Sequence, residues 1–61
     1  MERMKRVDFY EIWDNGTLLA DVGVYGFENE NDANIEGQRI AALISPTAVA
    51  TFDRTGIVFA E

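Results

Sequence analysis

The chain has 61 residues, of which 11 are acidic and 5 basic, and it contains neither His nor Cys. A chain of this length (1–61) folds as a single domain with a small core, and without Cys it can form no disulfide or thiolate zinc site. Because His and Cys are the commonest general bases and nucleophiles of enzymes, we expect a non-catalytic protein without a cofactor or metal.

The charge is unevenly distributed. Residues 1–6 form a basic tip with Arg3, Lys5 and Arg6; subtracting these and Glu2 from the totals leaves 10 acids and 2 bases in residues 7–61. No segment of about 20 apolar residues suggests a membrane span, and no signal-peptide core follows the charged start. We therefore expect a cytoplasmic protein whose acidic body repels nucleic acid and membranes and attracts basic protein surfaces.

The first predicted element is a β-hairpin over residues 7–27. The segment from Val7 to Trp13 is rich in β-branched and aromatic residues. Asn15-Gly16 is a strong signal for a two-residue turn, because both turn positions need a positive φ. Such a turn places Asp14 opposite Thr17.

This pairing predicts which side chains share a face, since opposed residues point to the same side of a sheet. The predicted inner face is apolar except for Glu11, which we expect to lie at the sheet edge or to pair with Arg39 or Arg54. A register shift of one residue would exchange the two faces. The inner face comprises Val7, Phe9, Glu11, Trp13, Leu18, Ala20, Val22 and Val24. The outer face comprises Asp8, Tyr10, Ile12, Leu19, Asp21, Gly23 and Tyr25, with Tyr10, Ile12 and Leu19 as an exposed apolar patch.

Residues 29–44 are predicted to form a helix. Asn29 or Asn31 can cap its start, the acids of its first turn suit the helix dipole, and Ser45-Pro46 ends it. Gly37 lies on the inner face, where it allows a close approach to the sheet. The positions at helical spacing on this face are Ala33, Gly37, Ile40, Ala41 and Ile44.

Residues 47–60 are rich in β-forming side chains. The sequence Asp53-Arg54-Thr55-Gly56 suits a type I turn, which predicts a second hairpin of residues 47–52 and 57–60. The alternative is one long strand with a bulge at Gly56. In both cases the fold class is α+β, ββαββ or ββαβ, with one helix on one face of a small antiparallel sheet of three to four strands.

The main candidate site is the acidic segment at the start of the predicted helix, which has no basic residue. Its ordinary interpretation is a solvated helix start favoured by the dipole. Its functional interpretation is a docking surface for Lys and Arg that imitates nucleic-acid phosphates, which a duplex presents about every 1.7 Å of its axis. The expected partner-binding residues are Glu28, Glu30, Asp32 and Glu36, with Asp14, Asp21 and Tyr25 as second choices.

A calcium loop is a further interpretation of the same segment, because Glu30, Asp32, Asn34 and Glu36 alternate along it. An EF-hand loop requires Gly at its sixth position and Glu at its twelfth, and neither occurs at that spacing. The sequence therefore favours an acidic surface without a bound metal.

In size, charge and element order the chain resembles the small acidic proteins with which phages and mobile elements inhibit host machinery, anti-CRISPR proteins among them. The resemblance is carried by the absence of Cys, the Asp14-Asn15-Gly16 turn and the Glu- and Asn-rich helix start. It implies a binder in the host cytoplasm that blocks a basic, nucleic-acid-handling surface as a DNA mimic.

The alternative is a small self-assembling structural module or an antitoxin-like interaction module. In this hypothesis the outer apolar patch or an open strand edge forms a homodimer.

Overall fold

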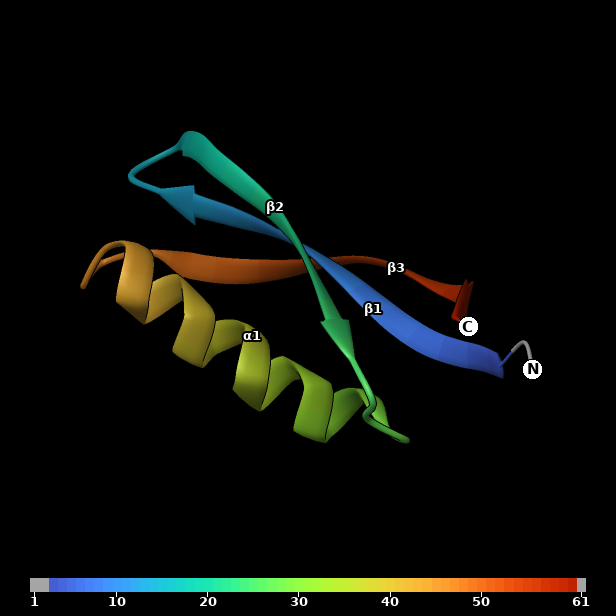
Figure 1. Cartoon of the computed structure of the whole chain (residues 1–61). Coiled ribbons are helices and arrows are strands. Elements are labelled where there is room, and N and C mark those ends of the chain that lie inside the picture. The colour runs from blue at the N-terminus through green and yellow to red at the C-terminus, as the bar shows by residue number, and fades with distance from the viewer. Residues whose placement is uncertain (1–2, 61) are drawn as a thin grey trace.

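The computed structural model describes residues 3–60 as three strands and one helix (Figure 1). The strands form one antiparallel sheet in the order β2-β1-β3, so that β1 is the central strand. The helix lies across one face of this sheet and contacts all three strands. The predicted α+β class is confirmed, in its ββαβ form. The elements are β1 (Arg3–Asp14), β2 (Thr17–Tyr25), α1 (Glu30–Ile44) and β3 (Val49–Ala60).

The predicted C-terminal hairpin is wrong, because residues 49–60 form one strand. β3 pairs with β1 along its length, and a register shift opposite Phe9 and Tyr10 leaves Asp53 as an extra residue. The alternative of one strand with a bulge is therefore correct, although the bulge lies at Asp53 and not at Gly56. The long central strand offers backbone partners to all of β3, which a separate terminal hairpin would leave unused.

The first hairpin turn has the predicted geometry. Asn15 and Gly16 both adopt positive φ values, 53° and 79°, and Asp14 pairs with Thr17. The strand before this turn is longer than predicted, since β1 begins at Arg3 and includes most of the basic tip.

A bulge in β2 makes the predicted register wrong beyond the turn. The pairing shifts by one residue between Ile12 and Trp13, because Leu19 is an extra residue in β2. Beyond it Tyr10 lies opposite Val22 and Asp8 lies opposite Val24. The two faces of β1 are therefore exchanged relative to the prediction, whereas Ala20, Val22 and Val24 of β2 lie on the helix side as predicted.

The exchange places Tyr10 and Ile12, predicted to be exposed, in the core beneath α1, where each is at most 1% exposed. Of the predicted outer patch only Leu19 remains on the surface. Tyr10 also packs edge-on against the ring of Phe52 on β3, with 5.7 Å between the ring centroids. The buried cluster consists of Tyr10, Ile12, Val24, Ala33, Ala41 and Ala50, bordered by Ala20, Val22, Phe27, Ile40 and Ala48.

The side chains predicted to point inward from β1 lie on the open face of the sheet, away from α1. Val7 is nevertheless fully buried, and Phe9 lies over it between two glycines of the neighbouring strands. An added Cβ would lie 3.1 Å from Val7 at Gly23 and 3.0 Å from the Phe9 ring at Gly56, so both glycines provide space for this small second cluster. Arg54 stacks on the same ring, with its Cζ 4.6 Å from the centroid.

Glu11 also lies on the open face, where it accepts a hydrogen bond of 3.2 Å from the indole of Trp13. Within residues 3–60, Glu11 forms no ion pair, so its predicted pairing with Arg39 or Arg54 is wrong.

The predicted ends of the helix are confirmed, although Ile44, predicted to lie on the inner face, is 46% exposed. The side chain of Asn29 caps α1 by accepting a hydrogen bond of 2.9 Å from the backbone N–H of Asp32. Ser45 ends the helix in an extended conformation, with φ −153° and ψ 139°. Gly37 is buried against the sheet, and a Cβ at this position would lie 3.4 Å from the ring of Tyr10.

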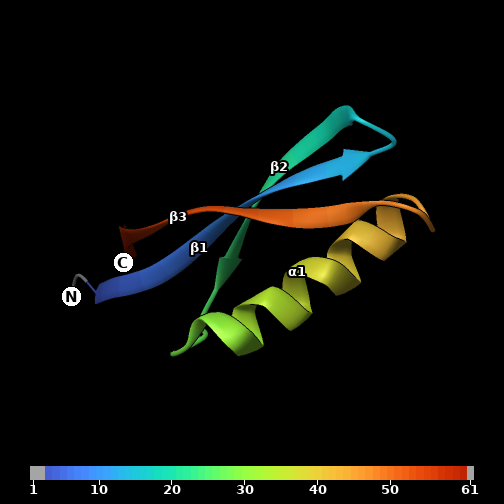
Figure 2. The ribbon, with the colours of Figure 1, turned by 180° about the vertical axis from the view of Figure 1, so that it is seen from behind.

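The molecule is elongated, with extents of 42 × 18 × 17 Å. β2 ends at Tyr25, opposite Val7, so residues 3–6 of β1 pair only with residues 57–60 of β3. We call this two-stranded extension the arm. Figures 1 and 2 show it projecting past the first turn of α1, with both chain ends at its tip.

The close approach of α1 to Tyr10 at Gly37 limits the size of the side chain that this position can accept. Gly37→Leu should lower the free energy of unfolding by about 1–3 kcal/mol, because the larger side chain would push α1 away from Tyr10. Ala42→Leu on the exposed side of the same helix should change it by less than about 0.5 kcal/mol. Urea denaturation measures both; equal effects of the two substitutions would contradict the close packing at Gly37.

Candidate partner-binding site

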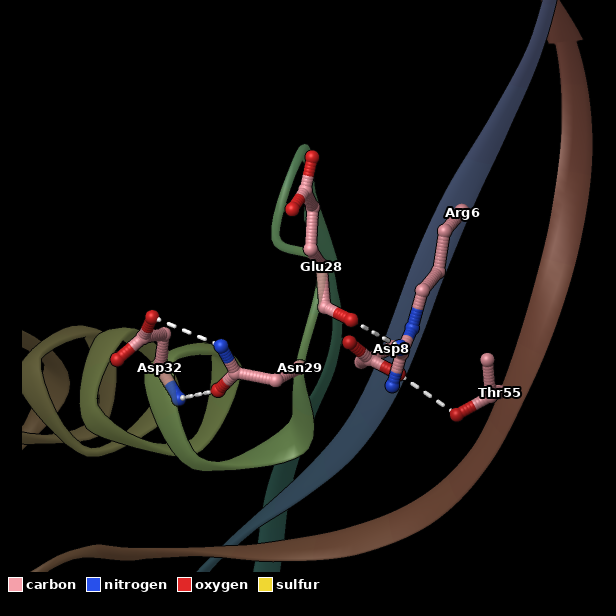
Figure 3. Close-up of polar contacts among 6 residues, drawn as sticks. All are labelled: Arg6, Asp8, Glu28, Asn29, Asp32 and Thr55. Atoms are coloured by element: carbon pink, nitrogen blue, oxygen red, sulfur yellow. Dashed lines mark hydrogen bonds and ion pairs between the residues drawn. The ribbon is translucent and has the colours of Figure 1, made fainter.

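The start of α1 brings three of the predicted acidic residues together on the surface. Glu28, Glu30 and Asp32 are all exposed, and they surround the capping residue Asn29. The Asn29 amide also donates a hydrogen bond of 3.1 Å to Asp32 Oδ2 (Figure 3). Neither ion pair of residues 3–60 involves these three carboxylates. We call Glu28, Glu30 and Asp32 the acidic turn.

A polar cluster beneath the acidic turn fixes its position on the sheet. Asp8 is 1% exposed, and its Oδ1 accepts hydrogen bonds from the Thr55 hydroxyl at 2.6 Å and from Arg6 Nε at 3.3 Å. Arg6 Nη1 donates a further hydrogen bond of 2.8 Å to the backbone carbonyl of Glu28 (Figure 3). The acidic turn is therefore tied through Arg6 to β1, and through Asp8 to β3.

From the sequence alone, Arg6 is placed only in the basic tip, and this structural role is not predicted. The signal was present, because residues two positions apart in a strand share a face. Arg6 and Asp8 have this spacing, and they form an ion pair of 3.2 Å.

Only one oxygen of the Asp8 carboxylate is hydrogen-bonded, since Oδ2 is buried without a hydrogen-bond partner among residues 3–60. An unpartnered buried acceptor costs about 1–3 kcal/mol, so the Arg6 charge is the main compensation for burying this carboxylate. Burial raises the pKa of the Tyr10 phenol, and the nearby Asp8 carboxylate adds to this rise.

Glu36, the fourth primary residue of the predicted site, is engaged within the helix. Arg39 Nε donates a hydrogen bond of 2.9 Å to Glu36 Oε1, and a second nitrogen of the same guanidinium contacts Oε2. These hydrogen bonds lower the pKa of Glu36 and raise that of Arg39. The charge of Glu36 is thus largely neutralised by Arg39 of the same helix.

The three second choices lie apart from the acidic turn. Asp14 is at the opposite end of α1, where it accepts hydrogen bonds of 2.7 Å from the hydroxyls of Ser45 and Thr47. Asp21 is exposed on the open face, directly opposite Glu11. Tyr25 is 54% exposed at the end of β2, opposite Val7. The structure therefore gathers only part of the predicted site in one place.

Within residues 3–60, no three acidic side chains are grouped closely enough to hold a metal ion. The one helix of this region lacks the length and apolar character needed to cross a bilayer.

No protein-family model, curated protein or solved structure matches this chain. The functional proposal therefore depends on the residues of the chain itself.

The ion pair beneath the acidic turn predicts different effects for two neighbouring basic residues. Arg6→Gln should lower the free energy of unfolding by about 1–3 kcal/mol, because it leaves the buried Asp8 carboxylate without its charged partner. Lys5→Gln is a matched control, since it removes the same charge from an exposed position of β1 and should cost less than about 0.5 kcal/mol. Chemical denaturation of the two variants at neutral pH distinguishes them; similar losses would show that Arg6 acts only through net charge.

Asp14 predicts a pH-dependent contribution to stability. Hydrogen bonds from Ser45 and then Thr47 lower its pKa below the ordinary value of 3.8. A lowered folded-state pKa stabilises the protein above the unfolded-state pKa, and this stabilisation is lost as pH falls through the folded-state pKa. The stability difference between wild type and Asp14→Asn should thus be constant above about pH 5 and shrink at lower pH.

Unfolding free energies measured across this pH range provide the test. Ser45→Ala/Thr47→Val should remove the same pH dependence, because it removes both hydrogen-bond donors. If the difference in unfolding free energy between wild type and Asp14→Asn stays the same at the lowest pH, the Asp14 carboxylate is not the source of that difference.

Proposed function

We propose that the protein is a non-catalytic binder that docks the acidic turn onto a basic surface of a protein that handles nucleic acid. The observation that carries this proposal is that Glu28, Glu30 and Asp32 are exposed and form no ion pair with any residue from 3 to 60. Three neighbouring carboxylates without a basic partner in this part of the chain can accept hydrogen bonds from Lys and Arg side chains of another protein.

The acidic turn is also held in place before binding. Arg6 fixes the backbone at Glu28, and the Asn29 cap fixes Asp32. A surface that is ordered in the free protein loses less conformational entropy on association, so more of its interaction energy appears as affinity.

The net charge of −6 supports the same type of partner. An anionic protein is steered towards basic surfaces and away from nucleic acid, and this steering weakens as the ionic strength rises. Because Glu36 is balanced by Arg39 and Asp14 is engaged elsewhere, the proposed DNA mimicry is local. It involves a few neighbouring phosphate positions and not a length of duplex.

Such a binder would act by occlusion, covering a groove that normally receives nucleic acid. Phage inhibitors of host enzymes in the cytoplasm, including anti-CRISPR proteins, use this type of action, and we propose the same class here. A self-assembling module is the second candidate, favoured by the exposed apolar side chains of the arm.

Affinity capture from bacterial lysate tests the proposal with two charge-matched variants. Glu28→Gln/Glu30→Gln/Asp32→Asn removes the acidic turn, and Glu11→Gln/Asp21→Asn/Asp53→Asn removes the same charge elsewhere. We expect wild type and the second variant to retain a nucleic-acid-binding protein, with at least about tenfold weaker binding by the first. Duplex DNA and raised salt should release the captured protein, because both compete with the carboxylates.

Equal retention by all three chains would place the contact outside the acidic turn. Retention that duplex DNA does not reduce would exclude the nucleic-acid-handling groove as the binding surface.

A further inference from the structure

The arm leaves a set of large apolar side chains uncovered. Met4 is 70% exposed, Ile57 64% and Phe59 70%. Met4 lies opposite Phe59, and Ile57 lies on the same face opposite Arg6, so the three share the side of the sheet that carries α1. A ribbon of two strands is marginally stable by itself, and it gains stability when a further strand or layer covers it.

The edges of the sheet differ in how well they are protected against pairing with another chain. The β2 edge is interrupted by the bulge at Leu19 and carries Asp21. The first half of β3 ends in the bulge at Asp53. Gln38 of α1 covers the edge of this half, because its amide donates a hydrogen bond of 2.7 Å to the carbonyl of Ala50 and accepts one of 3.0 Å from the backbone N–H of Ala50. Bulges, charges and covering side chains are the usual means of preventing edge pairing.

The second half of β3 has none of these protections. Residues 55–60 read Thr-Gly-Ile-Val-Phe-Ala, without a charge, a proline or a register shift. Apart from the glycine, these residues suit a β-strand, and the strand edge they form is open on the side away from β1. Within residues 3–60 this is the edge best suited to accept another strand.

We propose that a second copy of this chain is the partner, and that residues 55–59 of the two copies pair antiparallel to form a dimer. A two-fold axis between antiparallel strands places one residue opposite itself. Centring the axis on Ile57 uses the whole uncharged segment, with Thr55 opposite Phe59 and Gly56 opposite Val58 of the second copy. The two sheets then form one continuous six-stranded sheet.

This arrangement brings the exposed side chains of the two arms into contact along one face of the joined sheet. Ile57 of each copy meets its equivalent, and both Phe59 rings and both Met4 side chains extend the same apolar strip. The chain exposes 4402 Å² of surface, about 450 Å² more than the roughly 3950 Å² expected of a compact protein of 6.8 kDa. That excess is close to the roughly 500 Å² per partner that the smallest specific interfaces bury.

Pairing of this kind stops at two copies, because an isologous interface uses the same edge of both chains and the β2 edge is protected. The two-fold axis is perpendicular to the sheet, so both helices lie on the same side. Each copy keeps its own acidic turn on that side. The dimer stands independently of the proposed function, since it uses residues outside the acidic turn.

Cysteine crosslinking tests the pairing directly, because the chain contains no Cys. Opposed residues of antiparallel strands have Cα atoms about 4.5–5.5 Å apart, within the range a disulfide can span. Ile57→Cys should therefore form a covalent dimer under mild oxidation at low protein concentration. Ile35→Cys is the matched control, since Ile35 is equally exposed, at 62%, but lies on α1. Equal crosslinking of both variants would overturn the proposed register.

Sedimentation equilibrium gives a second measurement that does not depend on disulfide geometry. Wild type should dimerise reversibly, and Ile57→Lys should raise the dimer dissociation constant at least about tenfold by placing two charges opposite each other. Ile35→Lys should dimerise like wild type, and circular dichroism should show that both variants fold. A wild type that remains monomeric at about 100 μM, or a dimer that Ile57→Lys leaves unchanged, would overturn the proposal.

Discussion

The bulge at Leu19 aligns the apolar side chains of β2 with Tyr10 and Ile12 of the central strand, and the position of α1 depends on this alignment. With an unbroken ladder, Val22 and Val24 would lie on the other face, and Asp21 and Gly23 would face the helix. One extra residue thus gives the sheet a single continuous apolar surface to bury. Because the helix-facing residues of α1 are small, Ala33, Gly37 and Ala41, this surface can be approached closely.

Two carboxylates of the central strand hold the ends of the helix in place. Asp8 acts at its start through Arg6, and Asp14 acts at its end through Ser45 and Thr47. The acidic residues of this chain therefore have different tasks. Asp8 and Asp14 fix the fold, Glu36 is balanced within the helix, and the acidic turn remains available to a partner. Net charge alone does not distinguish these roles, because each depends on the groups that surround the carboxylate.

The small size of the chain explains why so much apolar surface stays exposed. One helix covers one sheet face from the hairpin end only as far as the arm, and the open face is closed locally by Phe9 packed over Val7 between two glycines. The arm extends beyond both clusters. The acidic turn and the outer edge of the arm are separate surfaces, so partner binding and self-association need not compete for the same residues.

The sequence by itself determined the features that depend on one or two neighbouring residues. Asn15-Gly16 specified the turn through its positive φ values, and Ser45-Pro46 specified the helix end. The helix start was narrowed to a cap at Asn29 or Asn31, of which Asn29 is the one used. The order of elements and the α+β class followed from these local signals together with the apolar periodicity. The exposure of Glu28, Glu30 and Asp32 follows from the same local helix start.

Only the tertiary structure decided the strand register, and with it the identity of the core. The bulges at Leu19 and Asp53 have no local signature, because each arises from the best total burial and hydrogen bonding across two strands and a helix. The contact of Asp8 with Thr55 and the separation of Asp14 from the acidic turn follow from the way the strands and the helix come together. The role of each charged side chain was therefore settled by contacts between segments far apart in the chain.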